Sequence, residues 1–320
     1  MLSTDSGDGL STEIVVGIED RSMKPLIFDE PAPLSPVPVL LFAKCPIPGR
    51  VKTRLAGVVG AQGAAELARA LLLDSLERFG GDRGEQGDPL LLLGDRPDLE
   101  TFLDEGGLGG AAERIATLAQ YRPQGEGSLG ARLLRAFRSA PLWVPGAQGA
   151  VAIGADAPHL DPGALRAAAM RVRDGASVLG PAEDGGYYLV GVSCDHPRLE
   201  ALFPDTGWGG PGVLAHARAV LESPSQVQQG KEVGPSPVHA ELQSLFDIDE
   251  EEDLTALADL LREGAQGRSE GTSSAMGIDP RLRLPACAAV IERILPSGRI
   301  RGAGAGEDPG GGGIPAPEPP

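Results

Sequence analysis

Short apolar runs alternate with longer amphipathic stretches through the middle of this 320-residue chain. The runs are rich in Val, Leu and Ile and are bounded by Gly, Pro and polar residues, a pattern typical of buried strands. The run over 115–120 is the weakest of them. Strands are expected at 37–44, 89–94, 115–120, 150–154, 177–180, 187–192 and 238–242.

The stretches between these runs carry apolar residues at helical spacing. Strands that alternate with helices predict an α/β fold, with a mostly parallel sheet flanked by helices. Because only a short turn separates 177–180 from 187–192, antiparallel pairing is expected there, which makes the sheet mixed. Helices are expected at 61–79, 129–139, 162–173, 211–221 and 250–261.

Composition changes at both ends of the chain. Residues 1–36 are polar and end in a Pro-rich stretch, with two short apolar pieces that suit a marginal hairpin. Beyond 263 the chain is rich in Gly, Ser, Glu and Pro, which bury too little apolar surface to offset their ordering entropy. We therefore expect a flexible extension over 1–36, one domain over 37–263 and a largely disordered tail over 264–320, which holds a short helix near 285–295.

The charge and the cysteines narrow the class of protein. A formal net charge of -17 disfavours nucleic acid and anionic membranes as partners. The three cysteines form no CxxC pair, which fits a reducing compartment. The N-terminus lacks the pattern of a secretory signal, and no apolar run approaches the length of a membrane span. A cytoplasmic protein is expected, and its oligomeric state stays open.

The loop after the first expected strand is the strongest chemical signal. It gathers four cations: Lys44, Arg50, Lys52 and Arg54. Pro46 and Pro48 stiffen this loop, and Gly49 permits close backbone approach. Since open α/β sheets bind ligands at the carboxyl ends of their strands, an anion such as a nucleotide diphosphate is favoured over a solvated basic turn. The spacing is not that of a Walker A loop.

Carboxylates follow two other expected elements. Asp156 comes after the strand at 150–154 among small residues, where one carboxylate and a diphosphate would suffice to hold Mg²⁺. The alternative role, capping the next helix, is better filled by Asp161. Asp247 and Asp249 precede the last helix of the domain, and one of them is a candidate second ligand. A lone loop histidine such as His159 is expected at the surface.

Two further motifs admit more than one interpretation. Glu183 and Asp184 precede two glycines and two tyrosines, a pattern that suits a turn between strands and a hydroxyl-binding pocket equally well. The sequence GEGSLG over 125–130 matches GxGxxG formally. It does not follow the first strand, and no acidic residue stands at the ribose position. A loop with Ser128 as helix cap is favoured over a dinucleotide site.

In this order, the segments FAKCPIPGRVKTRL, QGEGSLGARL, GADAPHL, GPAEDGGYYLVG and FDIDEEEDL resemble a family of bacterial transferases. The family is that of the rSAM/selenodomain-associated, or arsenosugar-biosynthesis-type, glycosyltransferases. It is similar to GT-A-type nucleotide-diphospho-sugar transferases, and more distantly to the molybdenum-cofactor and phospholactate nucleotidyltransferases. The resemblance covers about 37–263 and implies a GT-A-like three-layer sandwich.

The resemblance also implies roles for individual residues. Catalysis would fall to Lys52, Arg54 and Asp184. Mg²⁺ or Mn²⁺ would bind Asp156 and Asp249. The nucleotide would contact Phe42, Ala43, Lys44, Pro48, Gly49, Arg50, Lys52 and Arg54. The acceptor or sugar would contact Gln124, Glu183, Asp184, Gly185, Gly186 and Tyr187.

A metal-dependent glycosyltransferase, which takes a nucleotide-sugar donor and a small-molecule acceptor, is the favoured function. The first alternative is a nucleotidyltransferase that takes an NTP donor and a phosphorylated or carboxylated small molecule. A second is a nucleotide-binding module without catalysis. The glycine placement disfavours a nicotinamide-dependent dehydrogenase.

Overall fold

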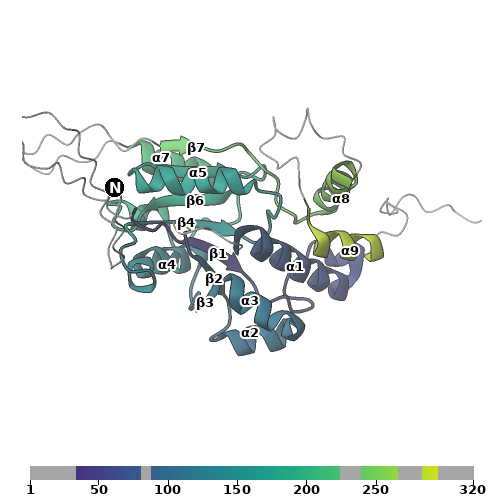
Figure 1. Ribbon diagram of the computed structural model, residues 1–320. Coiled ribbons are helices and arrows are strands. Elements are labelled where there is room, and N and C mark those ends of the chain that lie inside the picture. Colours follow the sequence, from purple (N-terminus) through teal and green to yellow (C-terminus); the bar gives the residue numbers. More distant parts are fainter. Residues whose placement is uncertain (1–33, 81–87, 224–238, 266–282, 295–320) are drawn as a thin grey trace, which may run out of the picture. The chain divides into compact units, whose positions relative to one another are not determined.

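The computed structural model describes residues 34–80, 88–223, 239–265 and 283–294 (Figure 1). Contacts divide the chain into the units Met1–Leu34 and Ser35–Pro320, and the elements below all belong to the second unit. The short apolar pieces expected near the N-terminus lie outside the described residues.

A seven-stranded mixed sheet forms the centre of the fold, with strand order β3-β2-β1-β4-β6-β5-β7 (Figure 1). The strands are β1 (Val39–Ala43), β2 (Leu90–Gly94), β3 (Gln120–Pro123), β4 (Gly149–Gly154), β5 (Ser177–Pro181), β6 (Tyr187–Ser193) and β7 (His239–Glu241). Only β6 among them runs against its neighbours, pairing antiparallel with both β4 and β5. The predicted mixed and mostly parallel sheet is therefore confirmed.

Two apolar cores lie on opposite faces of the sheet, because successive strand residues point to opposite sides. Val39 and Leu41 of β1 join one core, and Leu40 joins the other. The first core is covered by α1 (Ala56–Gly80), α2 (Leu99–Glu105), α3 (Ala112–Leu118), α5 (Pro162–Arg173), α8 (Glu251–Ala265) and α9 (Pro285–Ile294). The second is covered by α4 (Leu129–Trp143), α6 (Leu199–Leu202) and α7 (Val213–Glu222). The predicted three layers follow from this division.

One predicted strand is wrong. Residues 112–118 form helix α3, in which Ile115 and Leu118 are buried on one side at helical spacing. The chain becomes extended only at Ala119, and β3 begins at Gln120 as a partly exposed edge strand. An i, i+3 apolar pair in a six-residue run fits both periodicities, so tertiary packing decides the outcome.

Helix α1 differs from its prediction at its start. It begins at Ala56, but Gly60 has a non-helical backbone (φ 74°, ψ 160°), so the regular helix starts at Ala61 as expected. By length and composition alone α1 would be able to cross a membrane. A long helix packed in a protein core has the same length and composition. In this structure α1 buries Leu67, Leu71 and Leu76 in the core beside the sheet.

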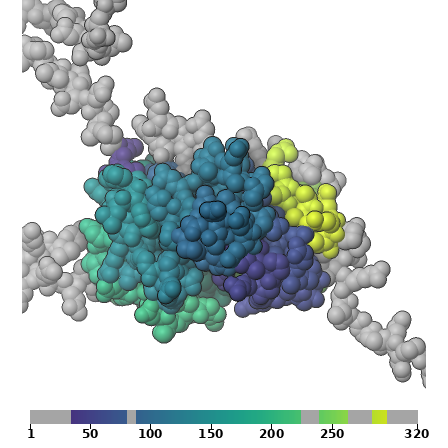
Figure 2. All heavy atoms as spheres, turned by 90° about the horizontal axis from the view of Figure 1, so that it is seen from below, coloured from purple at the N-terminus to yellow at the C-terminus, as the bar shows by residue number. Residues whose placement is uncertain are grey.

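Helix α9 lies beyond the C-terminal boundary predicted for the domain, where the sequence favours one short helix. It packs against α1, and the yellow atoms of α9 adjoin the blue atoms of α1 in Figure 2. Asp74 of α1 is buried and accepts hydrogen bonds from the backbone N–H groups of Ala286 (3.0 Å) and Cys287 (2.8 Å). This carboxylate therefore fixes the first turn of α9.

Candidate functional site

A cavity of about 390 Å³ opens at the edge of the sheet where β1 and β4 end. Because β6 runs antiparallel, its first residues reach the same edge. Of the predicted site residues, Phe42, Ala43, Lys44, Lys52, Gln124, Asp156, Asp184, Gly186, Tyr187 and Asp249 line this cavity. Pro48, Gly49, Arg50, Arg54, Glu183 and Gly185 lie outside its lining.

Lys52 lies between the acidic side chains of the cavity. Its ammonium bridges Asp156 and Asp249, at 2.9 Å from an Asp249 oxygen, and its side chain is only 5% exposed. Its backbone is left-handed (φ 47°), a conformation that no other non-glycine residue in the described ranges adopts. Such a conformation costs on the order of 1 kcal/mol and persists where the surroundings impose it.

Two loops distant in sequence bring Asp156 and Asp249 together. The N–H of the buried Ile248 donates to the Asp156 carbonyl (3.2 Å), so Asp247 and Asp249 flank the β4 loop. Behind them, the rings of His159 and Phe246 stack with centroids 4.4 Å apart. The pairing of Leu245 with Ala182 fixes the same segment beside the loop that carries Asp184. The carboxylates therefore meet because of backbone pairing and core packing.

The shared ammonium governs the protonation of this cluster. Burial disfavours the charged form of Lys52, but Asp156 and Asp249 raise its pKa above the ordinary value. Burial alone would raise the pKa of Asp249, yet Lys52 holds it below its usual range. Burial, Asp184 and Asp249 raise the pKa of Asp247, which faces the same cavity, to about 6. Asp247 therefore protonates more readily than Asp249.

His159 is not at the surface, and the prediction for this residue is wrong. Its side chain is fully buried, and neither ring nitrogen has a hydrogen-bond partner in the described part of the chain. Burial, assisted by Arg78, lowers its pKa to about 4. The ring is therefore a neutral packing element that stacks on Phe246.

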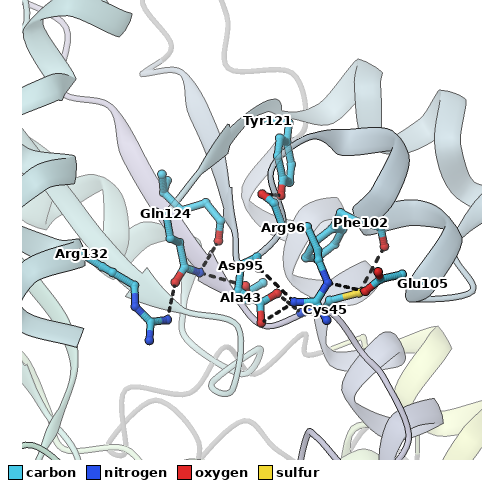
Figure 3. Close-up of polar contacts among 10 residues, drawn as sticks. Ala43, Cys45, Asp95, Arg96, Phe102, Glu105, Tyr121, Gln124 and Arg132 are labelled. Carbon is cyan, nitrogen blue, oxygen red and sulfur yellow. Dashed lines mark hydrogen bonds and ion pairs between the residues drawn. The ribbon is translucent and has the colours of Figure 1, made fainter. Parts of the chain in front are cut away.

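Gln124 lines the cavity directly after β3, and Figure 3 shows its polar contacts. Its buried amide donates to the carbonyls of Ala43 (2.9 Å) and Leu93 (2.7 Å), at the ends of β1 and β2. Its oxygen accepts from Arg132 of α4 (3.1 Å), a cavity residue that the sequence did not single out. The QGEGSLGARL segment held the signal, because Ser128 caps α4 and Arg132 follows one turn later.

The start of the cationic loop is anchored by polar contacts to the segment that follows β2. The Asp95 carboxylate accepts the backbone N–H of Cys45 (2.6 Å) and lies beside Arg96, which also pairs with Glu105 (Figure 3). The Cys45 thiol is buried and donates to the Phe102 carbonyl (3.4 Å). Since burial raises its pKa to about 11, Cys45 is a packing residue and not a nucleophile.

Aromatic residues form the side of the cavity that faces α4 and α7. Tyr187 and Trp208 meet edge to face, with centroids 6.0 Å apart. The loop that carries Trp208 crosses α4 at Gly130, where an added Cβ would lie 2.0 Å from the Pro204 carbonyl oxygen. Gly130, the last glycine of GEGSLG, therefore permits the crossing that brings Trp208 to the cavity. Trp208 was not predicted, since nothing in its local sequence signals this contact.

Asp156 and Asp249 are suited to share a divalent cation. Both are hard oxygen donors, half-exposed to the cavity and in contact with one ammonium. In the described ranges no group of three or more His, Cys, Asp or Glu side chains is arranged to hold a metal. The chain would therefore supply two carboxylates, and phosphate and water oxygens would complete the shell, as Mg²⁺ prefers.

Comparison with solved structures finds proteins of similar fold. A candidate nucleotide-diphospho-sugar transferase from Desulfovibrio desulfuricans G20 is 24% identical, with a TM-score of 0.53, over 81% of this chain and 97% of its own. A cytidylyltransferase from Leptospira borgpetersenii is 15% identical, with a TM-score of 0.41, over 83% of this chain and 97% of its own. Rv0371c from Mycobacterium tuberculosis H37Rv is 19% identical, with a TM-score of 0.35, over 69% of this chain and 97% of its own. The first of these likenesses shows a shared fold.

One family model also matches, that of an uncharacterized protein conserved in bacteria (DUF2064), over residues 92–210. This range begins within β2 and extends beyond β6, and it includes the GEGSLG motif and Glu183–Gly186. It includes neither the cationic loop nor Asp249. The comparison with curated proteins gave no match.

Proposed function

We propose that this chain is a metal-dependent glycosyltransferase that moves a sugar from a nucleotide diphosphate to a small-molecule acceptor. The observation that carries the proposal is the Lys52 bridge between Asp156 and Asp249 at the mouth of the cavity. A buried ammonium beside two half-exposed carboxylates offers a phosphate-binding cation and a cation-binding pair at one point.

In the proposed reaction, Lys44 and Lys52 bind the donor diphosphate from the side of the β1 loop. The acceptor hydroxyl transfers its proton to Asp184, and its oxygen bonds to the anomeric carbon of the sugar. The bond from that carbon to the diphosphate breaks, and its electron pair leaves with the nucleoside diphosphate. Lys52 stabilises this departing charge by a fixed positive charge in a site sheltered from water.

Asp156 and Asp249 would hold Mg²⁺ or Mn²⁺. When bound, such an ion supplies Lewis-acid stabilisation of the diphosphate oxygens. Arg54 is 65% exposed and pairs with Glu250 (3.1 Å). We therefore assign it a secondary role, steering the donor toward the cavity from outside. Tyr187, Gly186 and Gln124 would border the sugar and the acceptor.

The leaving group tests the proposal. The protein would be incubated with Mn²⁺ and radiolabelled UDP-, GDP- and CDP-sugars, and separately with the four NTPs, each with a mixture of small hydroxylated and carboxylated acceptors. Release of a nucleoside diphosphate together with sugar transfer supports the proposal. Release of pyrophosphate would contradict it and favour nucleotidyl transfer.

A third outcome concerns the non-catalytic alternative. Nucleotide binding without any acceptor-dependent product, in the wild type as in Asp184→Asn, would indicate a binding module. The matched variant Glu183→Gln changes the neighbouring carboxylate, which lies outside the cavity lining. It is expected to keep turnover if Asp184 accepts the proton.

A further inference from the structure

The cavity has two walls of different chemistry. On the side of α1 stand Lys52 and the carboxylates of the loops around 156 and 249. On the side of α4 and α7 stand Tyr187, Trp208 and Arg132, which belong to or follow elements of the opposite core. Donor diphosphate and metal would occupy the first wall, so the second wall is free to bind another ligand.

Arg132 is the cation of the second wall. Its guanidinium is half-buried and donates to Gly127 O (2.9 Å) and to the Gln124 oxygen (3.1 Å). Within the described ranges it pairs with no carboxylate, whereas Arg138 on the same helix pairs with Glu200. Its Nη2 makes no hydrogen bond to described residues. Gln124 thus orients the guanidinium but leaves its charge uncompensated beside the cavity.

The hydroxyl of Tyr187 is a second unsatisfied group in this wall. It is buried and has no hydrogen-bond partner among the described residues. A hydrogen bond left unmade by a buried hydroxyl is destabilising, and a ligand oxygen would supply the missing partner. Beside it, Trp208 is held by a hydrogen bond from its indole N–H to Pro204 O (2.6 Å). A fixed aromatic surface suits a planar or ring-shaped ligand.

From these contacts we infer that the acceptor is an anion, a carboxylate or phosphate ester with a ring or similarly flat body. Its charged group binds Arg132, its body packs on Trp208, and a polar atom meets the Tyr187 hydroxyl. This inference rests on the proposed function, because that function assigns the first wall to the donor. Anion binding at Arg132 is nevertheless independent of turnover.

The experiment uses Trp208 as its own reporter. The chain has two tryptophans, so a Trp143→Phe background leaves Trp208 as the only one. Phenyl phosphate is the anionic probe and phenyl glucoside the neutral one, titrated against fluorescence. Phenyl phosphate is expected to quench Trp208, and Arg132→Gln to weaken its binding at least tenfold. Arg138→Gln, which removes the same charge from the same helix, is expected to change nothing.

A second variant and a second ligand complete the test. Arg132→Lys keeps the charge without the planar fork and is expected to retain part of the affinity, even if Arg132→Gln folds poorly. Equal binding by all variants, or no quenching, would overturn the inference. Displacement of phenyl phosphate by UDP with Mn²⁺, with matching loss of UDP affinity in Arg132→Gln, would assign Arg132 to the donor and also overturn it. Arg132-dependent binding without sugar transfer would refute only the proposed function.

Discussion

The ammonium of Lys52 lies 2.9 Å from the carboxylate of Asp249, a residue 197 positions further along the chain. The same ammonium contacts Asp156, so three loops meet at one charged point. This point joins the cationic loop after β1 to the acidic loops after β4 and before α8. The proposed chemistry depends on that junction more than on any single motif.

Removing the ammonium tests its role in binding. Lys52→Met is expected to weaken binding of a nucleoside diphosphate by about 100-fold, since hydrogen bonds to charged groups contribute about 1.5–3 kcal/mol each. It should also lower the free energy of unfolding by about 1–2 kcal/mol, because two half-exposed carboxylates lose their counter-charge. Isothermal titration and urea denaturation measure the two effects.

Arg54→Gln is the matched comparison for Lys52→Met. Arg54 is 65% exposed, so water screens its charge, and its contribution to nucleotide binding should be at most about 1 kcal/mol, or about fivefold in affinity. Equal losses in the two variants would show that the ammonium has no special place in the site.

His159 predicts a specific acid sensitivity. Its pKa is about 4 in the folded protein against an ordinary 6.5, so between these values the unfolded chain binds the proton and the native state does not. Stability therefore falls as the pH is lowered through this window. From pH 7 to 5 the loss attributable to His159 is about 2 kcal/mol.

His159→Phe should remove that part of the pH dependence. Because the histidine nitrogens make no hydrogen bonds within the described structure, the change is expected to be nearly neutral at pH 7. Urea denaturation of both proteins at pH 7 and pH 5 measures the difference. Parallel loss of stability in the two proteins would mean that another group causes it.

Gly130 predicts a steric effect on Trp208. Gly130→Ala would press its Cβ into the backbone at Pro204 and is expected to cost about 1–3 kcal/mol of stability and to shift the emission of Trp208. The control is Gly57→Ala in α1, where an added Cβ meets nothing within 4 Å. Equal behaviour of both variants would contradict the close crossing of the loop over α4.

The hydrogen bonds of Asp74 are expected to hold α9 in place against α1. Asp74→Ala removes two hydrogen bonds from a carboxylate to the first turn of α9, a loss of about 1–3 kcal/mol. Labelling of the buried Cys287 thiol, in a Cys194→Ser background, should accelerate by at least about tenfold. Glu292→Gln, an exposed change on α9, should leave the rate unchanged, and an unchanged rate in Asp74→Ala would show that Asp74 does not hold the helix.

The order of elements was predictable because the hydrophobic periods are strong, and α5 lies at the predicted 162–173. The cap roles of Asp161 and Ser128 were equally local and are confirmed. The strand at 115–120 was wrong because its length and spacing suit both structures. The sequence was therefore sufficient to predict those features, such as helix caps and strongly periodic helices, that residues close in the chain determine.

The cavity was predictable only in part. Lys52 and Asp156 follow strands, and a sheet edge gathers whatever follows its strands. Arg132, Trp208 and the buried His159 depend on contacts across the fold, with Gln124, Gly130 and Phe246 respectively. Nothing in a linear pattern encodes which distant residue a side chain will meet.

Binding of Mn²⁺ measured by electron paramagnetic resonance, with and without UDP, GDP and CDP, tests the central claim most directly. The account predicts that one of these nucleotides increases Mn²⁺ affinity, and that Asp156→Asn and Asp249→Asn each reduce the nucleotide-dependent affinity at least tenfold, whereas Glu250→Gln does not. Mn²⁺ binding that is indifferent to nucleotide, or equal in wild type and both aspartate variants, would contradict it.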